Sequence, residues 1–115
     1  MILGSGIDIV EIARIQKAVE RWGEAFLNHV FTPAEIKHAR KFKFPFQHYA
    51  GRFAAKEAIF KAMGIPHLSW HQVTIINDTQ GKPVCHLDNI DFKHRLLISI
   101  SHSRDYAVAS AIVEG

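Results

Sequence analysis

The segment "RFAAKEAIFKAMG", Arg52 to Gly64, combines an alanine-rich helical pattern with a carboxylate, Glu57, that lies between two lysines. Its small residues allow another segment or a ligand to approach the helix closely. The final glycine and the Pro66 beyond it are typical of a helix end, so we expect a helix from about Gln47 to Met63. Glu57 and Lys61 are four residues apart and therefore share one face of this helix.

The charged residues of this helix allow two interpretations. Glu57 and Lys61 are compatible with a surface ion pair, which contributes a few tenths of a kcal/mol to stability. Glu57 is also a candidate metal ligand, because Asp8 offers a second carboxylate from a separate element. Two carboxylates that leave positions open for water and phosphate oxygens suit Mg²⁺. Lys61 would then neutralise phosphate charge beside the metal, and Arg52 is expected to flank the same edge.

The N-terminal residues predict a strand followed by a helix. Residues 2 to 10 alternate so that Asp8 lies on the opposite face from its isoleucine neighbours, Ile7 and Ile9. From Glu11 onward the apolar residues recur at helical spacing, and they are Ile12, Ile15, Val19 and Trp22. The other side of that helix carries a basic stripe, formed by Arg14, Lys17 and Arg21.

Two further helices are expected before the alanine-rich segment. Apolar residues between Phe26 and Phe31 have helical spacing. The motif "TPAE" follows, in which Thr32, Pro33 and Glu35 have the spacing of a capping box with proline at the first helical position. The helix that begins there is expected to end or kink at Pro45.

The second half of the chain has the alternation and turns of β-structure. "VTIIND" and "VCHL" flank the turn "TQGKP", while "RLLISISHS" and "YAVASAIVE" flank a turn at Arg104 and Asp105. With the N-terminal strand, these hairpins predict an α+β fold, in which helices of the N-terminal half pack on a small, mostly antiparallel sheet. Without a repeat or a linker, residues 1 to 115 are expected to form a single domain.

Composition narrows the possible functions. The 115 residues include 48% hydrophobic and 22% charged residues, and the net charge of +3 suits a phosphorylated or acidic partner without the dense basic blocks typical of nucleic-acid binding. The single cysteine, Cys85, excludes an internal disulfide and is most simply a small buried hydrophobe. We find neither a signal peptide nor a membrane span, and therefore expect a cytoplasmic protein.

The sequence also disfavours covalent catalysis by the protein. It contains no glycine-rich phosphate loop and no nucleophile elbow, and Cys85 lacks the positive surroundings of a reactive thiol. His102 lies at a strand end in "SISHS", where an imidazole among hydroxyl groups is compatible either with phosphate binding or with an ordinary turn.

Taken together, these motifs resemble the holo-[acyl-carrier-protein] synthase family, the small 4′-phosphopantetheinyl transferases. The resemblance covers essentially the whole chain and rests on five motifs in the family's order: "GIDIVEIARI" (6–15), "FTPAE" (31–35), "AGRFAAKEAIFKAMG" (50–64), "NDTQGKP" (77–83) and "ISISHSRDYAVASAIVE" (98–114). It implies the fold of that family. It also implies transfer of 4′-phosphopantetheine from coenzyme A to a serine of apo-acyl carrier protein, with release of adenosine 3′,5′-bisphosphate, in support of fatty acid biosynthesis.

The resemblance also implies roles for individual residues. Asp8 and Glu57 match the Mg²⁺ ligands, and Lys61 matches a lysine that neutralises or protonates the leaving phosphate. Arg52 and His102, together with Lys61, match positions that contact coenzyme A. Either Glu57 or a metal-activated water would deprotonate the carrier serine.

Further implications concern partners. The basic stripe of Arg14, Lys17 and Arg21 would meet the acidic recognition helix of the carrier protein. The family forms homotrimers with the coenzyme A site between adjacent subunits. This chain departs from the family at Pro66, where many members carry a second glycine.

Two other classes of function stay open as alternatives. A nucleic-acid-binding module would use the basic helix and bind in a salt-dependent manner without Mg²⁺ or coenzyme A. A metal-dependent phosphohydrolase would use the same two carboxylates and release free phosphopantetheine without a carrier.

Overall fold

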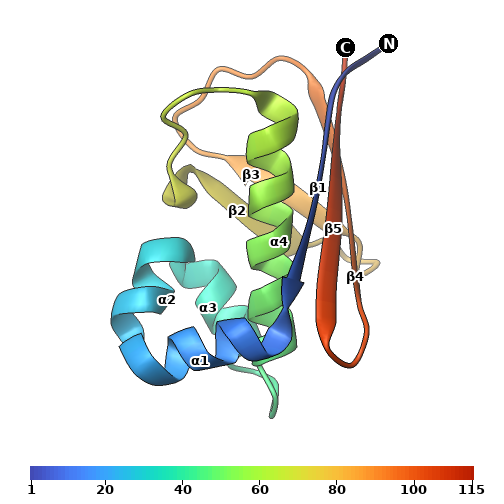
Figure 1. Ribbon diagram of the computed structural model, residues 1–115. Helices are drawn as coiled ribbons and strands as arrows, with labels where there is room; N and C mark the ends of the chain where they lie inside the picture. The colour runs from blue at the N-terminus through green and yellow to red at the C-terminus, as the bar shows by residue number, and fades with distance from the viewer.

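Helix α4 (Phe46–Met63) lies at the centre of the fold, which a computed structural model describes for residues 1–115 (Figure 1). The elements before it are β1 (Ile2–Glu11), α1 (Ile12–Trp22), α2 (Glu24–Val30) and α3 (Pro33–Ala39). Those after it are the 3-10 helix η1 (Trp70–Gln72), β2 (Val73–Asn77), β3 (Pro83–Leu87), β4 (Arg95–His102) and β5 (Tyr106–Glu114). The order confirms the α+β class, with the helices in the N-terminal half.

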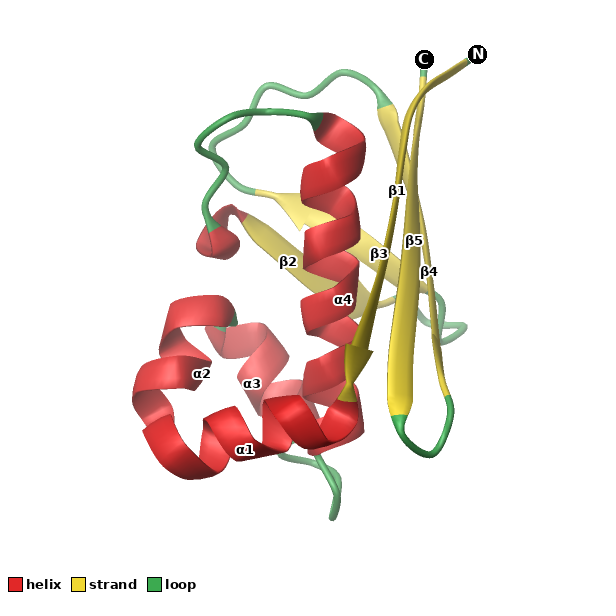
Figure 2. Ribbon diagram, viewed as in Figure 1, coloured by secondary structure: helices red, strands yellow, loops and turns green.

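The strands form two sheets rather than the single sheet that the sequence predicts. One sheet has three antiparallel strands in the order β1-β5-β4, so that β1 is an edge strand beside α4. The other sheet is the antiparallel hairpin β2-β3, in which β2 packs against α3 and α4 and β3 lies beside β4 without extending the first sheet. Figure 2 shows α4 beside the three-stranded sheet and in front of the β2-β3 hairpin. No helix combines the length and apolar content that crossing a bilayer requires.

The small residues of α4 allow strand β1 to contact the helix backbone. Ala54, Ala55 and Ala58 are completely buried. A Cβ atom added to Gly6 would overlap the carbonyl oxygen of Ala58. A Cβ atom added to Gly4 would overlap the carbonyl oxygen of Ala62, one turn farther along α4. Glycine is therefore required at these strand positions, because any side chain would push β1 away from α4.

The three-stranded sheet has one covered face and one uncovered apolar face. On the covered face, Ala107, Ala109 and Ala111 of β5 are buried against α4. On the other face, Ile7 is 65% exposed and Ile9 is 63% exposed. The isoleucines of β1 thus point away from the core, and Asp8 lies on the opposite, inner face of the strand. The alternation predicted from the sequence is therefore confirmed.

An ion pair inside the core joins α4 to its neighbours. Lys56 is completely buried, and its Nζ lies 2.6 Å from Oε1 of Glu35, which is also buried. The same Nζ donates hydrogen bonds to the carbonyl oxygens of Val30 (2.8 Å) and Trp70 (3.0 Å). Glu35 accepts a further bond from the backbone N–H of Ile75 at 2.9 Å. Lys56 is therefore a core residue and not a surface charge.

Thr32 and Glu35 are arranged as the predicted capping box at the start of α3. The N–H of Thr32 donates to Glu35 Oε1 at 2.8 Å, as the motif predicts. The buried Oγ1 of Thr32 has no hydrogen-bond partner. The carboxylate thus caps the helix and pairs with Lys56 at once. Helix α3 ends at Ala39, before Pro45, which instead immediately precedes α4.

Replacement of Gly6 by alanine is expected to destabilise the protein by about 1–3 kcal/mol, because the added methyl group forces β1 off α4. Denaturant unfolding measures this loss. Ser5→Ala is the matched control, since Ser5 is an exposed neighbour on the same strand. Equal stability of the two variants would contradict the close strand–helix contact.

Candidate functional site

Asp8 and Glu57 form the chemical centre of the site, and they come from β1 and α4. The alternation that turns Ile7 outward places Asp8 on the side of the helix, where 19% of its side chain is exposed. The pKa of Glu57 is raised, first by burial and then by the negative charge of Asp8, while Lys61 opposes the shift. The two carboxylates therefore interact electrostatically, as the sequence predicts from their separate elements.

Lys61 bridges from α4 to the edge of the sheet. Its Nζ donates to the carbonyl oxygen of Ile7 at 2.9 Å and lies 3.4 Å from Oδ1 of Asp8. Glu57 forms no ion pair with it, so the simple surface pair considered from the sequence is wrong. A shallow hollow of about 280 Å³ opens here, lined by Ile7, Asp8, Ile9, Lys61 and Val108.

The donor set of this site fits a hard divalent cation. Both Asp8 and Glu57 supply carboxylate oxygens, and a cation would offset both the burial and the negative charge of Asp8 that raise the pKa of Glu57. Histidine, cysteine and carboxylate residues gather nowhere in groups of three or more that would make an all-protein metal cage. A cation held by these two residues would keep positions for water and ligand oxygens, which is the arrangement that Mg²⁺ favours.

Arg52 does not flank the edge that carries Glu57, so this expectation is wrong. The two residues are five positions apart, which places Arg52 about 140° around α4 from Glu57. Its side chain is buried, and Nη2 donates to Oδ1 of Asn77 on β2 at 3.1 Å. Its buried Nε has no hydrogen-bond partner.

His102 lies exposed at the end of β4, near the beginning of α4. The pKa of His48, in the first turn of α4, is lowered by burial first and then by positive charge, including that of Arg52 and of His102. Arg52 and His102, two of the three residues expected to contact coenzyme A, therefore lie near the first turns of α4 within one chain. The third, Lys61, lies farther along α4 with Glu57, beside Asp8 of β1.

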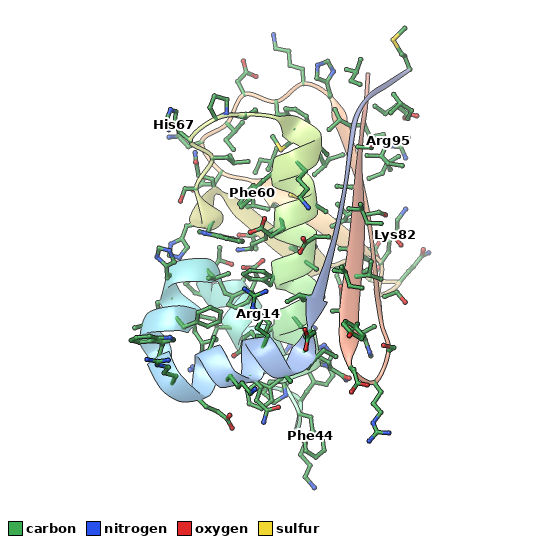
Figure 3. All side chains as sticks on the ribbon, viewed as in Figure 1. Arg14, Phe44, Phe60, His67, Lys82 and Arg95 are labelled. Atoms are coloured by element: carbon green, nitrogen blue, oxygen red, sulfur yellow. The ribbon has the colours of Figure 1, made fainter.

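The basic stripe of Arg14, Lys17 and Arg21 is exposed along α1, whose buried side is centred on Ile15. Figure 3 labels Arg14 on this helix. Trp22, which the spacing groups with the apolar face, is 58% exposed, and the Arg21 guanidinium lies 4.9 Å from the centre of its ring. The stripe thus ends in a cation–aromatic pair on the surface.

Two structural residues of the site region, Lys56 and Glu35, were missed by sequence reasoning. The capping motif gave Glu35 a local role, and only the flanking alanines hinted that Lys56 is buried. Cys85 is half-buried rather than fully buried, and burial raises the pKa of its thiol to about 12 and keeps it protonated, as expected of an unreactive cysteine.

The chain matches known proteins along nearly its whole length. The model of the 4′-phosphopantetheinyl transferase superfamily matches residues 4–111. A holo-[acyl-carrier-protein] synthase of Chlorobaculum parvum is 50% identical over 112 residues, which cover 95% of this chain and 96% of the relative. The corresponding Clostridium tetani protein is 44% identical over 124 residues and covers 100% and 98% of the two chains.

Solved structures of holo-(acyl-carrier-protein) synthases have the same fold as this chain. A Bacillus anthracis holo-(acyl-carrier-protein) synthase in complex with CoA (3′,5′-ADP) has a TM-score of 0.88 and 37% identity, covering 100% of this chain and 98% of that one. A Neisseria meningitidis synthase has a TM-score of 0.89 and 31% identity, with complete coverage of both chains (100% each). The chain belongs to the holo-[acyl-carrier-protein] synthases of the 4′-phosphopantetheinyl transferase superfamily. It is thus a transferase by family.

Glu57→Gln is expected to stabilise the metal-free protein near neutral pH by up to about 1 kcal/mol, a small gain because water screens a partly exposed carboxylate. The folded-state pKa of Glu57 is raised from 4.5, so the ionised wild-type carboxylate weakens the fold as pH rises above that value. The difference should vanish near pH 4, where Glu57 is protonated. Urea unfolding in the presence of a chelator measures both values, and a less stable variant near neutral pH would contradict the assignment.

Proposed function

We propose that this protein transfers 4′-phosphopantetheine from coenzyme A to a serine of apo-acyl carrier protein in a Mg²⁺-dependent reaction that releases adenosine 3′,5′-bisphosphate. The observation that carries the proposal is the pairing of Asp8 and Glu57 across β1 and α4, with Lys61 held against Asp8. The names of the relatives and the coenzyme A complex of the Bacillus anthracis protein support the substrates.

Asp8 and Glu57 would hold the Mg²⁺ ion, which would neutralise pyrophosphate charge and polarise the phosphorus that is attacked. Lys61 is placed by its bond to the Ile7 carbonyl, and its half-exposed ammonium is available to the leaving phosphate. Either Glu57 or a metal-activated water would accept the proton of the carrier serine. Phosphoryl transfer needs mainly positioning and charge neutralisation, which these three residues supply.

Coenzyme A contacts are proposed for Arg52 and His102 as well as Lys61. The unpartnered Nε of Arg52 is a donor that a phosphate oxygen would satisfy. Self-association into a homotrimer, with active sites between subunits, is part of the proposal. It is supported by the uncovered sheet face of Ile7 and Ile9, which borders the hollow at Asp8 and Lys61.

The carrier protein is proposed to dock on the basic stripe of Arg14, Lys17 and Arg21. Acyl carrier protein would present an acidic helix, and complementary charges steer such encounters. We further propose that residues 1–115 act as one transferase domain, that the protein supports fatty acid biosynthesis, and that it works in the cytoplasm, which a single protonated cysteine suits.

Incubation with apo-acyl carrier protein, coenzyme A and Mg²⁺ is expected to make the carrier heavier by one phosphopantetheine group, as measured by mass spectrometry. A chelator should prevent the gain, and Glu57→Gln should slow transfer by about a hundredfold or more. Absence of any gain with the cognate carrier would overturn the proposal. Release of free phosphopantetheine without a carrier would instead indicate a phosphohydrolase.

Arg14→Glu is expected to raise the Michaelis constant for the carrier by roughly tenfold and to leave that for coenzyme A unchanged, because it reverses one charge of the docking stripe. Lys82→Glu is the control, since Lys82 is an exposed lysine in the connection between β2 and β3. Steady-state kinetics with each substrate varied in turn separates the effects. A change confined to coenzyme A would show that the stripe is assigned wrongly.

A further inference from the structure

The connection between α3 and α4 carries an exposed tip of four residues, Lys41 to Phe44, and we refer to it by its sequence as the KFKF tip. Figure 1 shows the connection extending beyond the helices at the end of the molecule opposite both chain termini. All four residues are exposed, and Phe44 projects outward from this end in Figure 3. The KFKF tip therefore presents two aromatic rings and two ammonium groups to solvent.

The two phenylalanines of the tip have different surroundings. Phe42 stacks on His48 of α4, with ring centroids 3.7 Å apart and an interplanar angle of 20°, and His38 of α3 contacts the same ring edge-on at 5.3 Å. These contacts fasten the tip to both helices. Phe44 is 69% exposed, which makes it the most exposed aromatic side chain of the protein. Its ring is therefore available to enter an apolar phase, which removes its surface from water.

The charge of the KFKF tip is positive and unpaired. No acidic residue occurs in the sequence between Glu35 and Glu57, although this stretch contains six lysines and arginines. Neither Lys41 nor Lys43 forms an ion pair. The Nζ atom of Lys43 lies 5.6 Å from the centre of the Phe44 ring, so one positive charge sits directly beside the exposed aromatic group. Both ammonium groups are consequently free to meet an external anion.

An exposed ring flanked by unpaired cations suits the boundary of an anionic bilayer. Apolar side chains bury themselves where headgroups meet acyl chains, while lysines are attracted to the negative surface potential of anionic lipids. The absence of a membrane span, on which the expectation of a cytoplasmic protein rests, does not bear on such surface binding.

The shape of the tip favours a bilayer over a nucleic acid. A single strand is bound in a groove that follows its backbone, with aromatic rings on which bases stack. Here one ring, that of Phe42, already stacks on His48, and the other ring projects from a protruding end of the molecule. A protruding tip fits a flat surface.

We propose that the KFKF tip binds the surface of anionic phospholipid bilayers, with Phe44 inserted between the headgroups and Lys41 and Lys43 on the lipid phosphates. One exposed ring and two charges give weak and reversible binding rather than a permanent anchor. The inference rests on the exposed tip alone and does not require the transferase function.

The candidate metal site stays clear of a bilayer bound in this way. Figure 1 shows α4 rising from the end of the molecule that carries the tip. From Phe46, the first residue of α4, the helix rises about 16 Å to Glu57. That distance exceeds the depth to which a single side chain inserts, so the carboxylates remain accessible to water-soluble substrates while the protein is on the bilayer.

Sedimentation of the full chain with lipid vesicles tests this proposal. We expect the protein to bind vesicles made of equal parts phosphatidylcholine and phosphatidylglycerol and not to bind phosphatidylcholine alone, because only the first surface is anionic. Added salt should weaken binding, since it screens the lysines. Phe44→Trp should keep the affinity, and brominated acyl chains should quench the new indole. The wild-type protein, which contains only Trp22 and Trp70, gives the background of this quenching.

Two variants separate the aromatic contribution from the charged one. Phe44→Ala should lower partitioning onto the anionic vesicles by about tenfold or more, because the inserted ring is lost. Lys41→Gln combined with Lys43→Gln should lower it by roughly twentyfold, because each lysine near an anionic surface contributes a factor of about five. All three residues are exposed, so these variants are expected to fold.

Each variant has a matched control outside the tip. Trp22→Ala is the control for Phe44→Ala, since Trp22 is also an exposed aromatic ring beside a cation, the guanidinium of Arg21. Lys82→Gln combined with Lys93→Gln is the control for the lysine pair, since both are exposed. Vesicle binding of both controls should stay close to that of the wild-type protein.

Absence of binding to the anionic vesicles, or binding that Phe44→Ala leaves unchanged, would overturn the proposal. Release of the bound protein by adenosine 3′,5′-bisphosphate at constant ionic strength would also overturn it, since the lysines would then serve a soluble phosphate. Sedimentation velocity without lipid tests another occupant, because self-association that Phe44→Ala abolishes would assign the tip to a second copy of the chain instead of a bilayer. None of these measurements involves transfer to a carrier, so their outcome is independent of the proposed transferase.

Discussion

The buried ion pair between Lys56 and Glu35 is the interaction on which the rest of the structure depends. Its two side chains satisfy backbone groups of α2, η1 and β2 and of the N-cap of α3, and so join four elements to α4. A buried pair adds little net stability compared with apolar residues of the same volume, but loss of one partner leaves an unpaired buried charge and costs about 3–5 kcal/mol. The pair therefore restricts how α4 can be rotated more than it strengthens the fold.

The rotation of α4 decides where the chemistry lies. With Lys56 held inward, the next residue, Glu57, is turned about 100° around the helix and faces β1. Strand β1 can approach only because Gly4 and Gly6 present no side chain to the helix backbone. Asp8, two residues beyond Gly6 on the same face of the strand, is thereby brought within electrostatic reach of Glu57. The Lys56–Glu35 ion pair and the close approach at the two glycines together bring Asp8 and Glu57 near each other.

Local chemistry made much of this fold predictable from the sequence. Helix α4 was expected from about Gln47 to Met63 and runs from Phe46 to Met63, because a proline precedes it and a left-handed glycine, Gly64, ends it. Both hairpins followed from alternation and turn residues. Strand alternation also identified Asp8 as the partner of Glu57, since the period of a strand decides which residues share a face.

Tertiary contacts account for what could not be predicted. A lysine within a helix is expected to be exposed, and nothing local indicates that Lys56 reaches a carboxylate on another helix. The direction of Arg52 depends in the same way on Asn77, a residue of a later strand. Separation of the strands into two sheets depends on how β2 packs against α3 and α4 while β3 lies beside β4 without pairing with it. Each of these features needs the position of an element that is distant in sequence.

Edge strand β1 carries a candidate metal ligand on one face and exposed isoleucines on the other. Asp8 points toward α4, while Ile7 and Ile9 on either side of it point outward and stay largely exposed. Burial of an isoleucine side chain is worth about 1.5–3 kcal/mol, so a second copy that covers this face would gain stability at the residues that flank a candidate metal ligand. The carbonyl oxygen of Ile7 also holds Lys61. Assembly on this face would consequently act on the position of Asp8 and Lys61 through the strand itself, and a site that is shallow in the single chain would become enclosed where the copies meet.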